Sequence, residues 1–193
     1  SISSVSPIRQ FAGHMSDVEI VEFHPNGLYL VTAADDKTIR IWGIETGECV
    51  RLIYNYSNKS HVDTIGFANS GKIMVVGCDC SLVIYDLIRM GNPIRVVKNF
   101  TSSTIYSICL NLEDTYIVAS TQDQEIIFFD FDLLLNDQLN IEIDMNNYSN
   151  DSRFKYSYSY ATKKTPIMLM KFNSHNILMT LGRFDDNDPK IFM

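Results

Sequence analysis

The chain has 193 residues, of which 46% are hydrophobic and 20% are charged, the ordinary balance of a globular protein. Its formal net charge of −7 argues against a groove that tracks nucleic-acid phosphates, because such a groove depends on Lys and Arg side chains. The sequence contains no apolar run of about 18 residues, the length that indicates a membrane-spanning helix. We therefore expect partners that are proteins, with no direct binding of nucleic acid or of a membrane.

The N-terminal segment SISSVSPIRQF contains no apolar signal core and no initiator Met. It leads almost directly into a segment with the residue pattern of a β-strand. We interpret the chain as beginning inside a larger protein.

A repeat is visible from residue 30 onward. The segments 30–43, 74–86 and 117–130 align, and in each an Asp stands six residues before an aromatic side chain. The aspartates, Asp36, Asp79 and Asp123, are separated by 43 and 44 residues. We place the repeats at about 13–56, 57–99 and 100–143.

Each repeat has the residue pattern of four short strands. The first repeat shows β-branched and aromatic runs separated by the turn-forming segments 24–27 and 45–47, and these runs are 18–23, 28–33, 38–42 and 49–53. A four-stranded antiparallel sheet cannot bury both of its faces alone, whereas radial stacking of such sheets does. The sequence therefore predicts an all-β chain built as part of a β-propeller.

The four cysteines, Cys49, Cys78, Cys80 and Cys109, are not spaced like the ligands of a zinc site. We interpret them as small, half-buried side chains in a reducing compartment. The sequence also contains no phosphate-binding loop and no dinucleotide fingerprint. We expect neither a metal nor a cofactor.

After the third repeat the composition changes. Residues 144–161 are rich in Asn, Asp, Ser and Tyr, and we predict a polar loop there. Within it, 156–160 (YSYSY) alternates aromatic and small polar residues. This alternation favours a strand with one aromatic face over a platform that stacks nucleic-acid bases. A terminal strand pair follows within 162–184, with strands at 165–172 and 177–184.

The first repeat resembles the WD-repeat family. Gly13 and His14 precede its first strand and Trp42 ends its third, although the Asp that usually follows this Trp is Gly43. The resemblance implies a structural tetrad of hydrogen bonds formed by His14, Thr32, Asp36 and Trp42. A catalytic triad is the competing interpretation of such side chains, but no separate nucleophile or oxyanion hole is recognisable. We expect no enzymatic activity.

The other two repeats keep only the Asp of this tetrad. In the second, the His, Thr and Trp positions hold Asn58, Val75 and Tyr85, and in the third they hold Thr101, Ala119 and Phe129. We expect these repeats to rely on packing, because a half-made buried polar network is less favourable than an apolar replacement.

Residues 7–52 and 162–184 resemble, in that order, a middle repeat and the end of the propeller of the TFIID subunit 5 family. The resemblance implies the C-terminal portion of a seven-blade ring: three blades and a terminal strand pair. It also implies a nuclear, non-enzymatic scaffold in the general transcription factor TFIID that docks the histone-fold pair of TFIID subunits 6 and 9. Membership of a histone-acetyltransferase co-activator stays open. The alternative is another WD-repeat adaptor, such as a ubiquitin-ligase substrate receptor or a histone-tail reader.

Partner contacts are expected on the loop face that carries the repeated aspartates, since loops on a rigid scaffold often carry the binding residues. A solvated rim is the alternative interpretation of the same positions. The candidate residues, two from each repeat, are Asp17, Asp35, His61, Cys78, Thr104 and Gln122.

Overall fold

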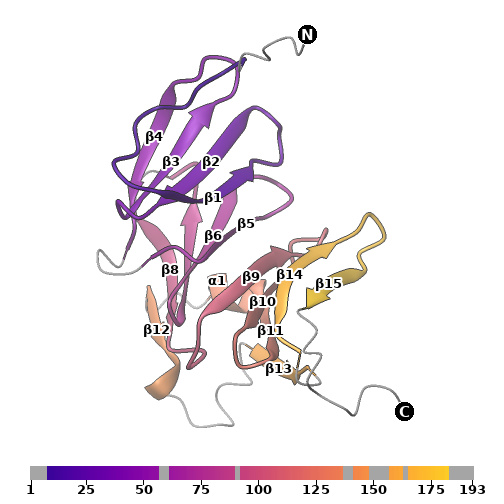
Figure 1. Ribbon diagram of the computed structural model, residues 1–193. Helices are drawn as coiled ribbons and strands as arrows, with labels where there is room; N and C mark the ends of the chain where they lie inside the picture. Colours follow the sequence, from indigo (N-terminus) through magenta and orange to yellow (C-terminus); the bar gives the residue numbers. More distant parts are fainter. Residues whose placement is uncertain are drawn as a thin grey trace.

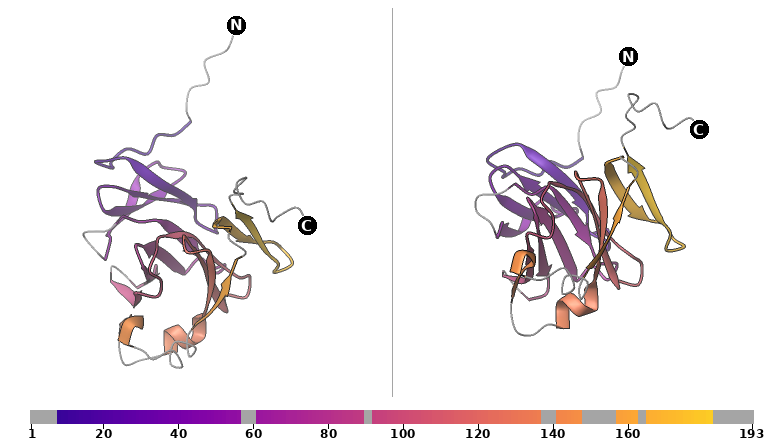
Figure 2. Two further views of the ribbon diagram at one scale, coloured as in Figure 1. Left: turned by 60° about the horizontal axis from the view of Figure 1, so that its bottom comes forward. Right: turned by 90° about the horizontal axis from the view of Figure 1, so that it is seen from below.

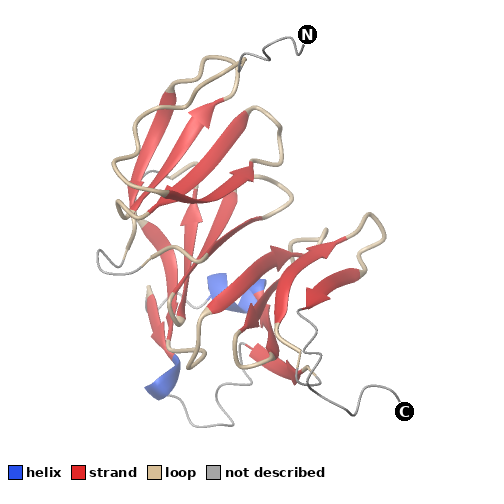
Figure 3. Cartoon of the chain, viewed as in Figure 1, coloured by secondary structure: helices blue, strands red, loops and turns tan. Residues whose placement is uncertain are grey.

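The computed structural model describes residues 8–56, 61–89, 92–136, 141–147, 157–162 and 165–182. Almost all of its regular structure is β-strand (Figure 3). In the described residues the strands form three larger sheets and one two-stranded hairpin (Figure 1). The predicted all-β architecture is confirmed. No helix in the described part of the chain is both long and apolar enough to cross a membrane.

The first sheet is a four-stranded antiparallel blade in simple chain order. The turn between its first two strands forms because Gly27 adopts a φ of 71° and the side chain of Asn26 accepts a hydrogen bond from the Leu28 amide. Its strands are β1 (Val18–Phe23), β2 (Tyr29–Ala34), β3 (Thr38–Gly43) and β4 (Cys49–Tyr54).

The second sheet contains a fifth strand that comes from far along the chain. The outermost strand of the blade pairs in parallel with β12 (Glu142–Asp144), which follows the third repeat. The ion pair between Lys98 and Glu142, 2.6 Å, joins the two strands. The other strands are β5 (Thr64–Phe67), β6 (Ile73–Cys78), β7 (Ser81–Asp86) and β8 (Pro93–Lys98).

The third sheet takes its outer strand from the segment predicted as a polar loop. That strand is β13 (Ser157–Ala161), and it pairs antiparallel with β11. The short helix α1 (Phe131–Asn136), capped by the Asp130 carboxylate, and the 3-10 turn η1 (Met145–Asn147) lie in the insertion before β13. The remaining strands are β9 (Ile105–Leu110), β10 (Tyr116–Thr121) and β11 (Glu125–Asp130).

The aromatic face predicted for 156–160 is present in β13. The ring of Tyr158 stacks on Phe128 with centroids 4.8 Å apart and meets Tyr116 edge-on. This packing holds β13 against the sheet. The part of the predicted loop at 148–156 lies outside the described residues.

The terminal hairpin consists of β14 (Ile167–Phe172) and β15 (Leu178–Gly182). Residues 183 and 184 of the predicted pair lie outside the described residues. The hairpin packs Ile167 and Met170 against Cys109, Val118 and Ile126 of the third blade. It forms a two-stranded sheet of its own within the described chain.

The blades pack face to face in chain order around a curve (Figure 2). Their first strands, β1, β5, β9 and β14, are successive neighbours. One apolar cluster joins the first and second blades around Val31, Ile39, Met74 and Tyr85, and another joins the second and third around Leu82, Ile84, Ile117 and Phe129. Each middle sheet is therefore covered on both faces, as the propeller prediction requires.

We predict that residues 1–193, expressed alone, associate or precipitate, because the hairpin leaves apolar side chains uncovered. Leu169, Met179 and Leu181 share one face of it and are 48%, 54% and 64% exposed. Replacing Met179 and Leu181 with Lys should reduce association in size-exclusion chromatography with light scattering. The control places two Lys in the adjacent turn, at Ser174 and His175. A monodisperse, cooperatively unfolding wild-type monomer would contradict the prediction.

Candidate functional site

The structure brings His14, Thr32, Asp36 and Trp42 together in one chain of hydrogen bonds. The Nδ1 atom of His14 lies 2.9 Å from Oδ2 of Asp36, and its Nε2 atom lies 2.6 Å from Oγ1 of Thr32. Because an ionised carboxylate only accepts, Nδ1 donates to Asp36 and Nε2 accepts from Thr32. The Trp42 indole donates to the Thr32 hydroxyl at 2.8 Å. The network links β2, β3 and the turn between them to the segment that enters the first blade.

Asp36 also holds the turn between β2 and β3. Its Oδ1 accepts from the Thr38 hydroxyl at 2.6 Å and from the Thr38 amide at 3.0 Å, and its Oδ2 accepts from the Met15 amide at 2.9 Å. Burial alone raises the pKa of this carboxyl, but the hydrogen bonds from Thr38, Met15 and His14 outweigh burial and the net pKa is lowered. Thr38 was missed by the sequence reasoning, although an Asp-x-Thr turn is a recognisable signal.

Gly13 lies where the entering segment closely approaches the blade. Its φ is 153°, and a Cβ there would lie 2.4 Å from an Arg40 nitrogen and 3.2 Å from the Trp42 ring. Phe11 packs edge-on against Trp42 with centroids 5.9 Å apart. The segment before β1 thus covers Trp42, which is 1% exposed.

The hydrogen bonds of the tetrad have a structural role, and we call the network of His14, Thr32, Asp36 and Trp42 the strut. Thr32 is 6% exposed, and its hydroxyl donates to His14 and accepts from Trp42. A hydroxyl with both roles filled in a buried site is not presented to a substrate. Among the described residues, no group of three or more His, Cys, Asp or Glu is placed to hold a metal ion.

The second blade differs from the sequence alignment in its register. Leu30 pairs with Trp42 in the first blade and Met74 pairs with Tyr85 in the second, so the residue that matches Thr32 is Val76 rather than Val75. The cause is the hairpin between β6 and β7, in which Cys78 pairs directly with Ser81 and the loop is one residue shorter than in the first blade. Asn58, predicted at the His position, lies outside the described residues.

In the second blade, which has the shortened hairpin, the carboxylate with a buried oxygen belongs to Asp63 and not to the repeated Asp79. Asp63, just before β5, accepts a hydrogen bond from the backbone of Asp79, while its Oδ2 is buried without a partner among the described atoms. Burial raises the pKa of Asp63 to about 6, and the nearby Asp79 adds to the rise while the Asp79 amide and His61 oppose it. No sequence signal marks this residue, because its burial arises only from the packing of neighbouring loops.

The third blade keeps a reduced network at Asp123. Its carboxylate accepts from the Ser102 hydroxyl at 2.8 Å, and its amide donates to Ser103 at 3.1 Å. Asp123 is exposed, and Thr101 at the His position bonds to Ser103 instead. Ala119 and Phe129 are fully buried. Packing replaces the polar strut here.

Five of the six candidate partner residues lie at least partly exposed on the loop face, and one does not. Asp17 and Asp35 are neighbours through a backbone hydrogen bond of 3.0 Å, and Thr104 and Gln122 are joined in the same way at 2.9 Å. Asp17, Thr104 and Gln122 are exposed, and Asp35 is half-buried. These four residues therefore lie at the surface.

The structure shows that Cys78 was wrong as a candidate partner residue. It is 2% exposed and packs in the apolar cluster between the first two blades. The short hairpin makes Cys78 the last residue of β6, so its side chain lies on the sheet rather than in the loop, and the exposed loop residue is Asp79. Burial raises the pKa of the Cys78 thiol to about 12.

His61 links the loops of the first two blades. Its Nδ1 donates to Asp35 at 2.5 Å, and its side chain stays 61% exposed. Glu19, Asp35, His61 and Asp63 line one depression on this face. The arrangement can present hydrogen-bond acceptors and negative charge to a protein partner.

A comparison with family models recognises two consecutive repeats in the first part of the chain. The WD domain, G-beta repeat model matches residues 5–43 and 47–86. The solved structure of U3-55K superposes on this chain with a TM-score of 0.64 at 13% identity, covering 83% of this chain and 44% of that one. Such a likeness shows the fold, and it agrees with a partial WD-repeat propeller.

Among curated proteins, the chain is similar to transcription initiation factor TFIID subunit 5 of Caenorhabditis elegans, with 25% identity over 95% of the chain. Ribosome biogenesis protein BOP1 homologs match more locally. Identity is 49% over 66 residues in Drosophila persimilis and 44% over 48 residues in Monosiga brevicollis, which are 34% and 25% of the chain. The chain spans 28% of the length of the TFIID protein, and its matches cover 8% and 6% of these two BOP1 homologs.

We predict that the strut stabilises the first blade only. Asp36→Ala leaves the donors of His14, Met15 and Thr38 without their acceptor and should cost about 1–3 kcal/mol in the free energy of unfolding. Asp123→Ala removes an exposed carboxylate with one side-chain donor and should cost less. Denaturant unfolding of the complete propeller measures both, and equal losses would contradict a special role for Asp36.

We also predict that Asp63 makes stability depend on pH. The folded state holds its proton up to a pKa of about 6, whereas an ordinary Asp loses it near 3.8, so stability falls as the pH rises between these values. Asp63→Asn should therefore stabilise the protein relative to wild type more at pH 7 than at pH 4.5. The exposed Asp17→Asn is the control. A difference that does not change with pH in thermal unfolding would refute the assignment.

Proposed function

We propose that this chain is part of a non-enzymatic scaffold subunit of TFIID that acts in assembly of the RNA polymerase II pre-initiation complex. The observation that carries the proposal is the extent of the match to TFIID subunit 5, which covers 95% of the chain. That match runs through the divergent repeats and the insertion as well as the well-formed first repeat. A rigid propeller suits a scaffold because it fixes loops from several blades around one partner.

The BOP1 homologs give the second candidate, a ribosome biogenesis factor. Their identity is higher, at 44–49%, but it covers only 22–34% of the chain. A match of about the length of one repeat is what two unrelated WD proteins share through the strut and strand pattern alone. We therefore give more weight to the share of the chain that is matched than to the identity within a short match. A TFIID subunit stays our first candidate, ahead of a ribosome biogenesis factor or another WD-repeat adaptor.

We place the docking surface for the histone-fold pair, TFIID subunits 6 and 9, on the loop face that carries the strut Asp. This face combines Asp17 and Asp35 with Glu19 and Asp63 in the neighbouring depression. We infer a partner surface with complementary positive charge, since charge complementarity speeds encounter and fixes orientation. Affinity would depend on a few contacts, to which Thr104 and Gln122 contribute from the third blade.

Affinity purification of the tagged complete protein from nuclear extract tests the assignment. We expect TFIID subunits, including 6 and 9, to co-elute, together with nuclear localisation of the protein. Additional co-elution of acetyltransferase subunits would extend the assignment to a second complex. Recovery of ribosome biogenesis factors without TFIID subunits would replace it with the BOP1-type function.

Charge reversal tests the proposed docking face. Asp17→Lys combined with Asp35→Lys should reduce co-elution of subunits 6 and 9 while leaving the fold intact, because both side chains lie on the loop face and the Asp35–His61 contact lies at the surface, where such a contact contributes little to stability. The matched control is Glu45→Lys with Glu113→Lys, two exposed positions in turns of the opposite face. Unchanged co-elution of the Asp17/Asp35 variant would remove this surface from the interface.

A further inference from the structure

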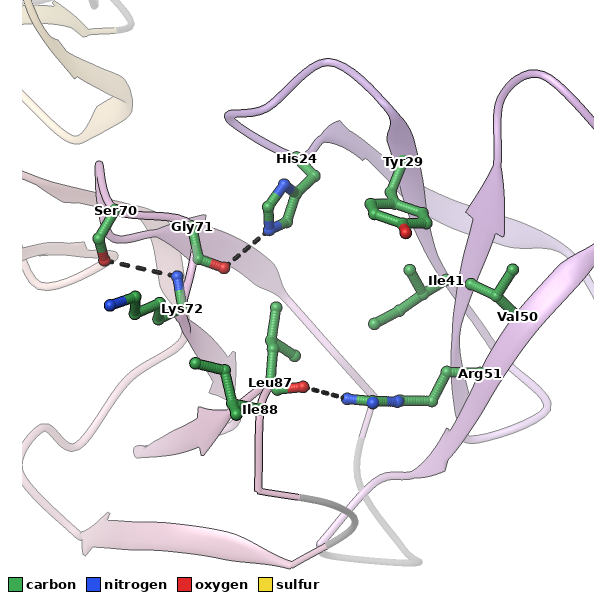
Figure 4. Close-up of a pocket in the computed structure, with 10 residues that line it drawn as sticks. All are labelled: His24, Tyr29, Ile41, Val50, Arg51, Ser70, Gly71, Lys72, Leu87 and Ile88. Atoms are coloured by element: carbon green, nitrogen blue, oxygen red, sulfur yellow. Dashed lines mark hydrogen bonds between the residues drawn. The ribbon is translucent and has the colours of Figure 1, made fainter.

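A groove lies between the first two blades on the face opposite the Asp36 turn. Antiparallel pairing puts the turn between the second and third strands at one end of each blade, and the other two turns at the opposite end. The groove is formed at this opposite end by the β1–β2 and β5–β6 turns, strand β4 and the residues that follow β7 (Figure 4). Its volume is about 340 Å³, which is within the range of ligand-binding pockets.

Part of the groove lining is aliphatic. Ile41 forms part of its base, and Val50, Leu87 and Ile88 line its sides. Val50 is 55% exposed and Ile88 is 65% exposed. Large aliphatic side chains with this exposure, gathered around one concavity, form a binding surface for another apolar side chain.

Two hydrogen bonds across the seam hold the groove in shape. His24 Nε2 donates to the carbonyl oxygen of Gly71 at 2.7 Å, and Nδ1 of the same ring accepts from the Asn26 amide at 3.3 Å. Arg51 Nη1 donates to the carbonyl oxygen of Leu87 at 2.6 Å. Figure 4 shows the His24–Gly71 and Arg51–Leu87 bonds bridging the two blades. A groove fixed in this way loses little entropy when it binds a ligand.

The charge of the groove is opposite to that of the chain. Arg51 and Lys72 line it, and none of its described lining residues is acidic, although the chain carries a formal charge of −7. Lys72 is exposed, and its ammonium forms no ion pair with any residue in the described part of the chain. Cations beside aliphatic side chains fit a ligand that combines carboxylates with an apolar side chain.

We propose that this groove binds an acidic peptide segment of a partner protein, with one aliphatic or aromatic side chain inserted against Ile41 and Ile88 and a flanking carboxylate paired with Lys72. A nucleic-acid strand is the less suitable occupant, because a phosphate backbone needs a longer track of cations than two side chains provide. The groove lies on the opposite face from Asp17 and Asp35. It therefore adds a second docking position to the one proposed for the histone-fold pair.

Fluorescence polarisation with the complete protein tests this binding. The probe is a fluorescein-labelled twelve-residue peptide in which Leu and Phe alternate with Asp and Glu. We expect saturable binding that weakens about tenfold on Lys72→Glu and to a similar degree on Ile88→Asp. Both side chains are exposed, so neither substitution should unfold the blade. Lys171→Glu on β14 makes the same charge change outside the groove and should alter the dissociation constant by less than about twofold.

Two further ligands test the specificity of the groove. The same peptide with Asn and Gln in place of Asp and Glu should bind much more weakly, and equal binding would refute the role of Lys72. Competition by a twelve-nucleotide thymidine strand at equal concentration would show a general anion site and overturn the peptide assignment. The peptide assignment would also be overturned if no saturable binding were found, or if neither Lys72→Glu nor Ile88→Asp changed the dissociation constant. Co-elution with TFIID subunits is measured separately, so the two proposals fail independently.

Discussion

The structure depends on the burial of both faces of each four-stranded sheet. The second blade shows the constraint fully met: Met74 and Tyr85 pack toward the first blade, and Leu82 and Ile84 pack toward the third, each of them 2% exposed or less. Hydrophobic burial is non-directional, so it tolerates different side chains at equivalent positions as long as volume and polarity are kept. That tolerance explains how the repeats can diverge in sequence while their strands keep the same arrangement.

Polar hydrogen-bond networks add to this packing, and the first blade has the full tetrad. In the first blade Asp36 has donors on both oxygens, and His14, Thr32 and Trp42 satisfy one another. In the third blade Ala119 fills the Thr position, and a Trp in place of Phe129 would lack an acceptor. The first blade therefore keeps the whole network, whereas the third has apolar residues at the buried Thr and Trp positions and a reduced network only at the exposed Asp123. This agrees with the free-energy difference between satisfied and unsatisfied buried groups.

Strands, turns and the strut could be predicted because each depends on local residue chemistry. The first-blade strands lie within one or two residues of their predicted bounds, and β13 appears where YSYSY alternates. The register of the β6–β7 hairpin could not be predicted, since deleting one loop residue leaves the Asp-to-aromatic spacing intact while moving Val76 into the Thr position and burying Cys78. The pairing of β12 with β8 and the burial of Asp63 depend on contacts between segments far apart in sequence, which no local pattern records.

The insertion after β11 ties the second and third blades together. It leaves the third sheet, buries Leu134, Ile143 and Met145 in the cluster between the two blades, and adds β12 to the edge of β8 before the chain returns as β13. This route covers an edge strand that would otherwise offer unpaired backbone groups to another chain. The seam between the first and second blades has no comparable strap among the described residues; packing and the side-chain hydrogen bonds of His24, Arg51 and His61 hold it. A seam closed by side chains alone is the place where a groove can stay open to a partner, and it is there that the cations and exposed aliphatic side chains meet.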